Sequence, residues 1–167
     1  MRKLYFVLFI GITWVGMACN KSVSEEDSAA KQRATDFQTV IQANKYMLVS
    51  FYADKPIDYI TNDADVKSET DLWPYVKVHV KDDEYFFGAN GALSISQKTD
   101  RISGNDAATI NGSYSVAAKG QDVSVTFVDY MYAPLEYKLH EFDNGFFTVY
   151  VDGPSGSKLY SKYARVQ

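Results

Sequence analysis

Few side chains in this chain could carry out covalent or acid–base chemistry. The sequence contains one cysteine, Cys19, and two histidines, His79 and His140. The histidines are far apart in the sequence and lie among lysines or glutamates, so we interpret both as solvated or hydrogen-bonded. A zinc-type site needs several His, Cys or carboxylate ligands at short spacings. The sequence therefore predicts no catalytic residues, no metal site and no cofactor, and we do not expect an enzyme.

Acidic side chains gather in two places. In the first, residues 54–71, the stretch DADVKSETD alternates acids as a calcium loop does. It lacks the glycine at the sharp turn and the terminal glutamate of such a loop, so calcium binding stays open and a solvated connection is the simpler interpretation. In the second, KDDE at residues 81–84, nothing fixes the separation that a glycosidase pair requires. We interpret it as a turn that solvates charge.

The residues before Cys19 are typical of an export signal. Arg2 and Lys3 precede an apolar run over residues 4–17, and the small residues Gly16 and Ala18 stand just before the cysteine. The apolar run is shorter than the roughly 20 residues of a membrane-spanning helix. Because the chain has no second cysteine, Cys19 cannot form an internal disulfide in the oxidising compartment that export would reach.

A cysteine directly after such a segment resembles the lipobox of bacterial lipoproteins, although Gly16 occupies the position where leucine is usual. The resemblance implies removal of residues 1–18 and attachment of lipid to Cys19, and several acyl chains make such anchoring stable. Asn20 in place of an aspartate implies the outer membrane. SEED at residues 24–27 resembles the acidic tag of some surface lipoproteins, or is a solvated tether, so the membrane face stays open. The alternative is a secreted protein whose signal happens to contain a cysteine.

Composition and charge limit what the remaining chain can be. We expect residues 19–29 to be a lipidated tether without regular structure and residues 30–167 to be one domain. Loss of Arg2 and Lys3 with the signal lowers the net charge from −4 to −6. Such an acidic protein is poorly suited to bind nucleic acid. The 13 tyrosines and 10 phenylalanines favour β-structure.

The hydrophobic pattern predicts one short helix followed by eight strands. Ala30, Ala34, Phe37 and Ile41 form the apolar stripe of a helix over residues 30–43. Short strand patterns separated by turn signals then recur at nearly regular intervals, which favours an antiparallel sheet closed into a barrel. The predicted strands cover residues 46–53, 84–87, 92–96, 109–116, 122–128, 134–142, 146–151 and 158–166.

The segment around residues 69–80 has two interpretations. Val76, Val78 and Val80 alternate with polar residues, which predicts a strand. Pro74 and the preceding Ser and Thr residues suit the start of a short helix.

The succession of motifs along residues 44–167 resembles the lipocalin-like domains of bacterial lipoproteins. The matching stretches are YMLVSFYA, KDDEYFFGANGAL, GSYSV, DVSVTF, YKLHEF and GSKLYSKY. The resemblance implies an all-β fold, an eight-stranded antiparallel up-and-down barrel of the calycin type. It also implies a helix near residues 69–80, which we therefore prefer there. The family shares no enzymatic activity.

Two functions remain from the sequence. The first is non-enzymatic binding of a small apolar ligand inside the barrel, since a barrel of this size can hold one small molecule. The second is a solid barrel whose loops bind a protein or glycan. Alternation along the predicted strands gives the candidate interior residues for the first function: Tyr114, Val125, Phe127, Tyr137, Leu139, Phe147, Val149 and Tyr163.

Overall fold

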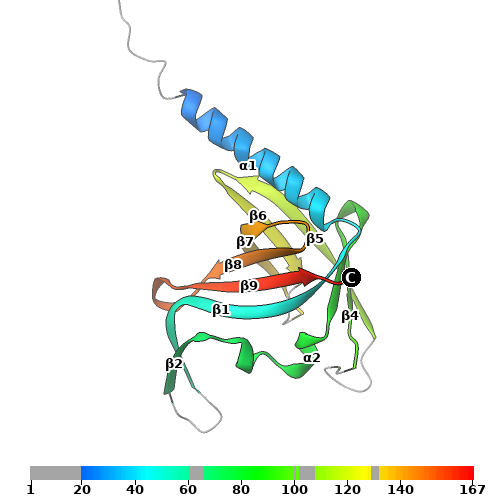
Figure 1. Cartoon of the computed structure of the whole chain (residues 1–167). Coiled ribbons are helices and arrows are strands. Elements are labelled where there is room, and N and C mark those ends of the chain that lie inside the picture. Colours follow the sequence, from blue (N-terminus) through cyan, green and yellow to red (C-terminus); the bar gives the residue numbers. More distant parts are fainter. Residues whose placement is uncertain (1–19, 61–65, 100, 102–107, 129–131) are drawn as a thin grey trace, which may run out of the picture.

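The computed structural model describes residues 20–60, 66–99, 101, 108–128 and 132–167. The predicted signal, residues 1–18, and Cys19 lie outside the described residues. One long helix, α1 (Asn20–Ile41), lies over one end of an antiparallel barrel (Figure 1). The strands are β1 (Lys45–Ile60), β2 (Val66–Asp71), β3 (Glu84–Phe87), β4 (Ala92–Ser96), β5 (Thr109–Lys119), β6 (Asp122–Val128), β7 (Pro134–Phe142), β8 (Phe146–Asp152) and β9 (Lys158–Arg165).

Eight strands close the barrel in sequence order. Neighbouring strands from β3 to β9 pair antiparallel, and β1 joins the two ends by pairing with both β3 and β9. Closure leaves these strands without a free edge. The predicted eight-stranded up-and-down barrel is therefore confirmed. The ninth strand, β2, pairs with β1 as an addition to the ring.

Residues 54–71, interpreted from the sequence as a solvated connection, are strand at both ends. Strand β1 continues to Ile60 and pairs antiparallel with β2, with Ile57 opposite Glu69. The strand predicted for residues 46–53 therefore continues past Pro56, which has no N–H to donate. Pro56 lies between Tyr52 and Ile57, where the register with β2 shifts and no paired amide is needed.

Of the two interpretations of residues 69–80, the strand over residues 76–80 is not present. Trp73–Tyr75 form one turn of 3₁₀ helix, and Val78–Lys81 form a four-residue helix, α2. Val76 and Val80 are buried, whereas Val78 is 66% exposed, so the valines do not share a face. The preferred helix is present only as these two short turns, because β2 occupies the chain up to Asp71.

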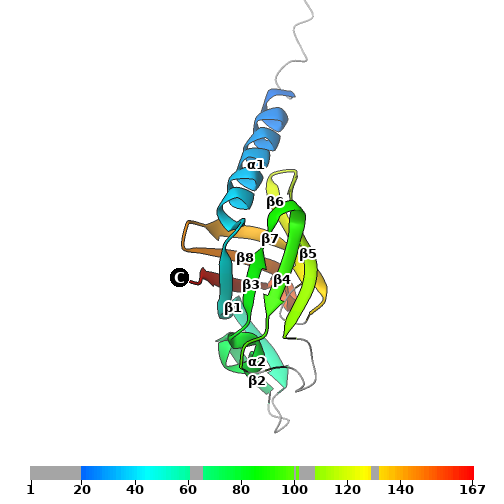
Figure 2. The same cartoon turned by 90° about the vertical axis from the view of Figure 1, so that its right-hand side faces the viewer.

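The helix α1 closes one end of the barrel. Its predicted apolar stripe is buried. Phe37 packs edge-on against Phe142 of β7 and Phe147 of β8, with ring centres 5.3 and 5.5 Å apart. Arg33 also donates from Nη2 to the His140 carbonyl at 2.6 Å. In both Figure 1 and Figure 2, α1 and α2 lie at opposite ends of the barrel.

The helix also begins ten residues before the predicted start, at Asn20, so residues 20–29 are helical rather than irregular. This part has no apolar stripe by which it could be recognised, but extending an existing helix is much easier than starting one. Gln121, at the β5–β6 turn, donates a hydrogen bond to Glu26 and ties this part to the barrel. Within the described part of the chain, no helix is both long enough and apolar enough to span a membrane.

Candidate ligand site at the α2 end of the barrel

All eight candidate interior residues are buried, as the alternation along the strands predicts. None is more than 5% exposed. They come from β5, β6, β7, β8 and β9, and their register places them on one face of the sheet, with Val125 opposite Tyr137 and Phe147 opposite Tyr163. The inward orientation is therefore confirmed. Their role as ligand contacts stays a prediction.

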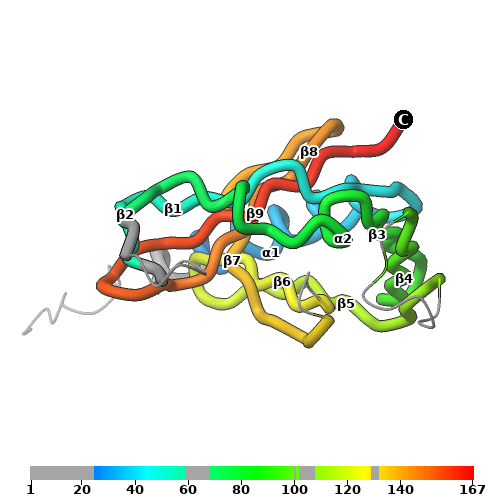
Figure 3. Tube along the Cα trace, turned by 90° about the horizontal axis from the view of Figure 1, so that it is seen from below, coloured from blue at the N-terminus to red at the C-terminus, as the bar shows by residue number. Residues whose placement is uncertain are grey.

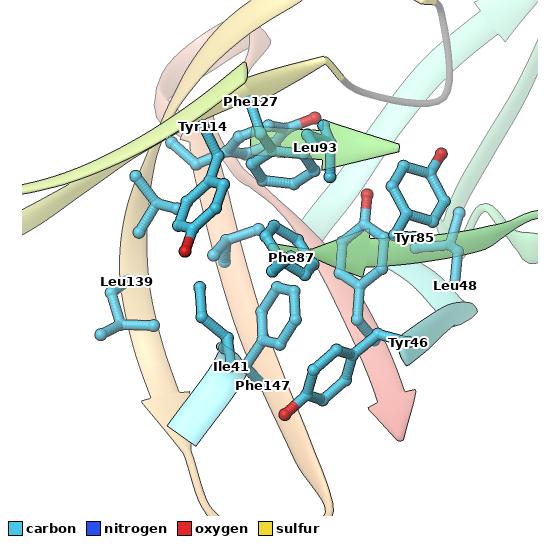
Figure 4. Close-up of a cluster of buried hydrophobic side chains, with 14 of the residues drawn as sticks. Ile41, Tyr46, Leu48, Tyr85, Phe87, Leu93, Tyr114, Phe127, Leu139 and Phe147 are labelled. Carbon is cyan, nitrogen blue, oxygen red and sulfur yellow. The ribbon is translucent and has the colours of Figure 1, made fainter. Parts of the chain in front are cut away.

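Aromatic rings fill much of the space between these strands. Figure 4 shows Phe87 of β3 among rings from neighbouring strands, close to Ile41 of α1. Its ring centre lies 5.1 Å from that of Tyr114, 5.8 Å from that of Phe147 and 5.9 Å from that of Phe127. Phe127 also stacks on Tyr137 at 4.9 Å. These edge-to-face and stacked distances are those of rings in direct contact, so this part of the interior is a packed core.

The interior becomes polar toward the α2 end. On β3 the inward row runs from Phe87 through Tyr85, and Asp83 lies two residues further along the same alternation. On β4 the inward row of Leu93 and Ile95 leads in the same way to Gln97. Asp83 is 0% exposed and Gln97 is 3% exposed. Figure 3 shows the barrel from this end, with α2 beside β3.

One further side chain completes a polar cluster, which we call the α2-end cluster and define as Asp83, Gln97 and Tyr132. The Tyr132 hydroxyl donates to Asp83 Oδ2 at 2.7 Å. It accepts a hydrogen bond from Gln97 Nε2 at 3.0 Å. The His79 ring lies nearly parallel to the Tyr132 ring, with centres 6.3 Å apart.

Two acceptor atoms of this cluster remain unfilled. Asp83 Oδ1 and Gln97 Oε1 are buried and accept no hydrogen bond from any residue that the structure describes. A buried acceptor without a donor costs about 1–3 kcal/mol, so native proteins nearly always supply a partner. The missing donors can come from water or from a ligand.

Burial controls the charge of the cluster. The pKa of Asp83 is raised to about 6, chiefly because burial removes the hydration of the carboxylate; the Tyr132 hydrogen bond opposes this shift, Asp82 adds to it, and His79 opposes it. Burial, followed by the hydrogen bond to Asp83, raises the pKa of Tyr132 well above its usual value, so its hydroxyl remains a donor. Asp83 therefore changes charge in mildly acidic solution.

The interpretation of KDDE as a solvated turn was wrong for Asp83. Its neighbour Glu84 does face outward and pairs with Lys45 and Lys98 at 3.2 and 2.9 Å. The two adjacent acids point to opposite sides of the barrel wall, as alternation along a strand requires. That alternation, extended backward from Phe87 and Tyr85, was the sequence signal that could have identified Asp83.

Other predicted features do not form a site in the described part of the chain. No group of three or more His, Cys, Asp or Glu side chains there is placed to hold a metal ion. The calcium question is not settled, since residues 61–65 lie outside the described residues. His140 is exposed and contacts Tyr160, with ring centres 5.0 Å apart. A surface hollow of about 390 Å³ near Gly145 and Arg165 is lined by none of the eight predicted interior residues.

Comparison of the sequence with protein families and curated proteins does not assign this chain to a family. No protein-family model matches the chain, and no curated protein is significantly similar to it.

Proposed function

We propose that this protein is a lipid-anchored lipoprotein of the bacterial cell envelope whose barrel binds a small ligand without catalysing a reaction. The observation that most supports this proposal is the α2-end cluster. Two of its buried acceptor atoms lack a hydrogen-bond donor, and it lies at the end of an aromatic interior. The ligand would place its polar end against Asp83, Gln97 and Tyr132 and its apolar part toward the rings of the barrel. Because the rings around Phe87 are already in contact, this proposal confines the ligand to the α2 half.

The proposed anchor would set the orientation of the barrel. The described part of α1 starts at Asn20, next to the predicted lipidated Cys19. Ten helical residues before Ala30 span about 15 Å. Lipid on Cys19 would therefore place the α1 end nearer the membrane and the α2 end, with the candidate site, farther from it.

Replacement of Cys19 tests the anchor. We expect the full chain to sediment with membranes when expressed in a bacterial host, and Cys19→Ser to lose the lipid mass and leave the membrane fraction after signal cleavage. Fractionation and intact-mass measurement report both properties. A Cys19→Ser protein that stays in the membrane without added lipid mass would contradict the proposed anchor.

Native mass spectrometry of the protein purified from its natural envelope tests ligand binding. We expect an extra mass that disappears on denaturation, because a ligand that fills Asp83 Oδ1 and Gln97 Oε1 is retained during mild purification. A protein of unchanged mass, also after incubation with envelope extract, would contradict the binding proposal.

The packed interior favours the second function, a barrel that acts through its surface. Rings such as Phe87, Phe127 and Phe147 leave little space between them. An unliganded protein in the experiment above, together with retention of an envelope protein or glycan on the immobilised full chain, would favour this surface function.

A further inference from the structure

We propose that the α2-end cluster binds the ammonium group of a small organic amine. This inference rests on the proposed ligand-binding function and specifies its ligand class. It concerns the three residues of the α2-end cluster and the neighbouring His79 ring.

The hydrogen-bond inventory of the cluster favours a ligand rich in donors. Tyr132 gives its single proton to Asp83 Oδ2, so its oxygen must receive a hydrogen, and only the nitrogen of the Gln97 amide can supply it. This fixes the amide orientation and leaves Gln97 Oε1 as an acceptor. With Asp83 Oδ1, two buried acceptors remain for a partner from outside the described residues. A primary ammonium offers three donors, whereas an alcohol offers one.

The charge balance of the cluster favours a cation. The charged or titratable groups that act on Asp83 are Asp82, Tyr132 and His79. None of the four ion pairs seen among the described residues involves Asp83. Two lysines close to the cluster in the sequence contact other groups: Lys98 pairs with Glu84, and Lys81 lies 4.8 Å above the Trp73 ring. Among the described residues only His79 acts on Asp83 as a positive charge, so a cationic ligand would supply the compensation that a buried carboxylate needs.

The groups around Asp83 disfavour an anionic ligand. His79 and Tyr132 present two nearly parallel rings beside Asp83. A carboxylate or phosphate ligand would meet the negative charge of the Asp83 carboxylate here, which disfavours an anionic head group.

Three probes with the same apolar body separate the ligand classes: phenethylamine, 2-phenylethanol and 3-phenylpropionate. We would titrate each at pH 7.5 by calorimetry into the full chain held in phosphatidylcholine nanodiscs, with empty discs as the blank. We expect the amine to bind at least about tenfold more tightly than the alcohol, because charge-assisted hydrogen bonds are about twice as strong as neutral ones. We expect the carboxylate not to bind.

Asp83→Asn and Glu84→Gln form a matched pair for this experiment. Both remove one carboxylate from adjacent positions, but only Asp83 faces the interior. We expect Asp83→Asn to weaken amine binding by at least about tenfold while alcohol binding stays within about twofold. Glu84→Gln should keep the preference for the amine. In the unchanged protein, amine affinity should fall about tenfold per pH unit once Asp83 becomes protonated.

The outcomes distinguish this inference from the function on which it rests. An amine that binds no better than the alcohol, or that binds no worse to Asp83→Asn, would show that the cluster is not an ammonium site and is satisfied by water. If native mass spectrometry still finds cargo, the ligand-binding barrel stands and only its ligand class is wrong. Absence of both cargo and probe binding would overturn both proposals.

Discussion

Phe87→Ala should lower the free energy of unfolding by about 3–5 kcal/mol, the range for truncating a buried phenylalanine. Phe87 is 0% exposed, and its ring lies within 6.0 Å, centre to centre, of the rings of Tyr46, Tyr114, Phe127 and Phe147. Removal of the ring would leave a cavity bordered by five strands, and such rigid surroundings collapse only in part. Urea unfolding followed by tyrosine and tryptophan fluorescence measures the change.

The neighbouring residue is the matched control for this prediction. Phe86 belongs to the same strand, but its side chain points outward and is 37% exposed. We expect Phe86→Ala to cost less than about 1 kcal/mol, because surface substitutions seldom exceed that amount. Equal losses for the two variants would mean that Phe87 does not occupy the centre of the core.

Asp83→Asn should stabilise the ligand-free protein at pH 8 by about 2–3 kcal/mol. The folded pKa of Asp83 is raised to about 6, above the unfolded value of about 3.9. The folded state therefore binds the proton more tightly, and stability falls as pH rises through the window from about 4 to 6. A shift of about two pKa units corresponds to about 3 kcal/mol, and asparagine avoids this loss because it cannot ionise.

At pH 4 the same variant should match the unchanged protein within about 1 kcal/mol, since both side chains are then mostly neutral. Glu84→Gln should show the opposite pH trend. Lys98, with Lys45, lowers the pKa of Glu84, so its stabilising effect is present at neutral pH and lost as the pH falls through the folded pKa. Denaturant unfolding at pH 4, 6 and 8 tests both variants. An Asp83→Asn effect that does not depend on pH would contradict a buried, ionisable Asp83.

The two Asp83 experiments are linked. If an ammonium ligand compensates Asp83, then ligand binding should stabilise the unchanged protein most at neutral pH, where the uncompensated carboxylate destabilises it most. The ligand would restore the free energy of unfolding that the ionised Asp83 lowers in the ligand-free protein. A ligand site of this kind conflicts with maximal stability of the empty protein, as binding sites commonly do.

Local sequence patterns determined most of the barrel. Alternation with a period of two placed Val125, Phe127 and Tyr137 inside, and turn signals separated eight strands correctly. The stripe of Phe37 and Ile41 identified the part of α1 that packs on the barrel. These features depend on the order of nearby residues, because a pleated strand and a helix each impose a fixed spacing on the buried side chains.

Contacts between distant residues decided the rest. Whether Pro56 ends β1 depends on the register of β2, which no local pattern around the proline contains. The turn of α2 buries Val80 and exposes Val78, against the alternation of the valines. The first ten residues of α1 are helical as an extension of the packed part that follows them. In each case the tertiary environment outweighed a weak local preference.

In the candidate site, too, local sequence patterns determined some features and contacts between distant residues determined others. The sequence by itself determined the inward-facing residues of the barrel and the single cysteine at its predicted anchor. Only the tertiary structure brought together Asp83, Gln97 and Tyr132, which are separated by 14 to 49 residues in the chain. A buried acceptor is recognised by the absence of a donor in three dimensions, and residue type alone cannot reveal that absence.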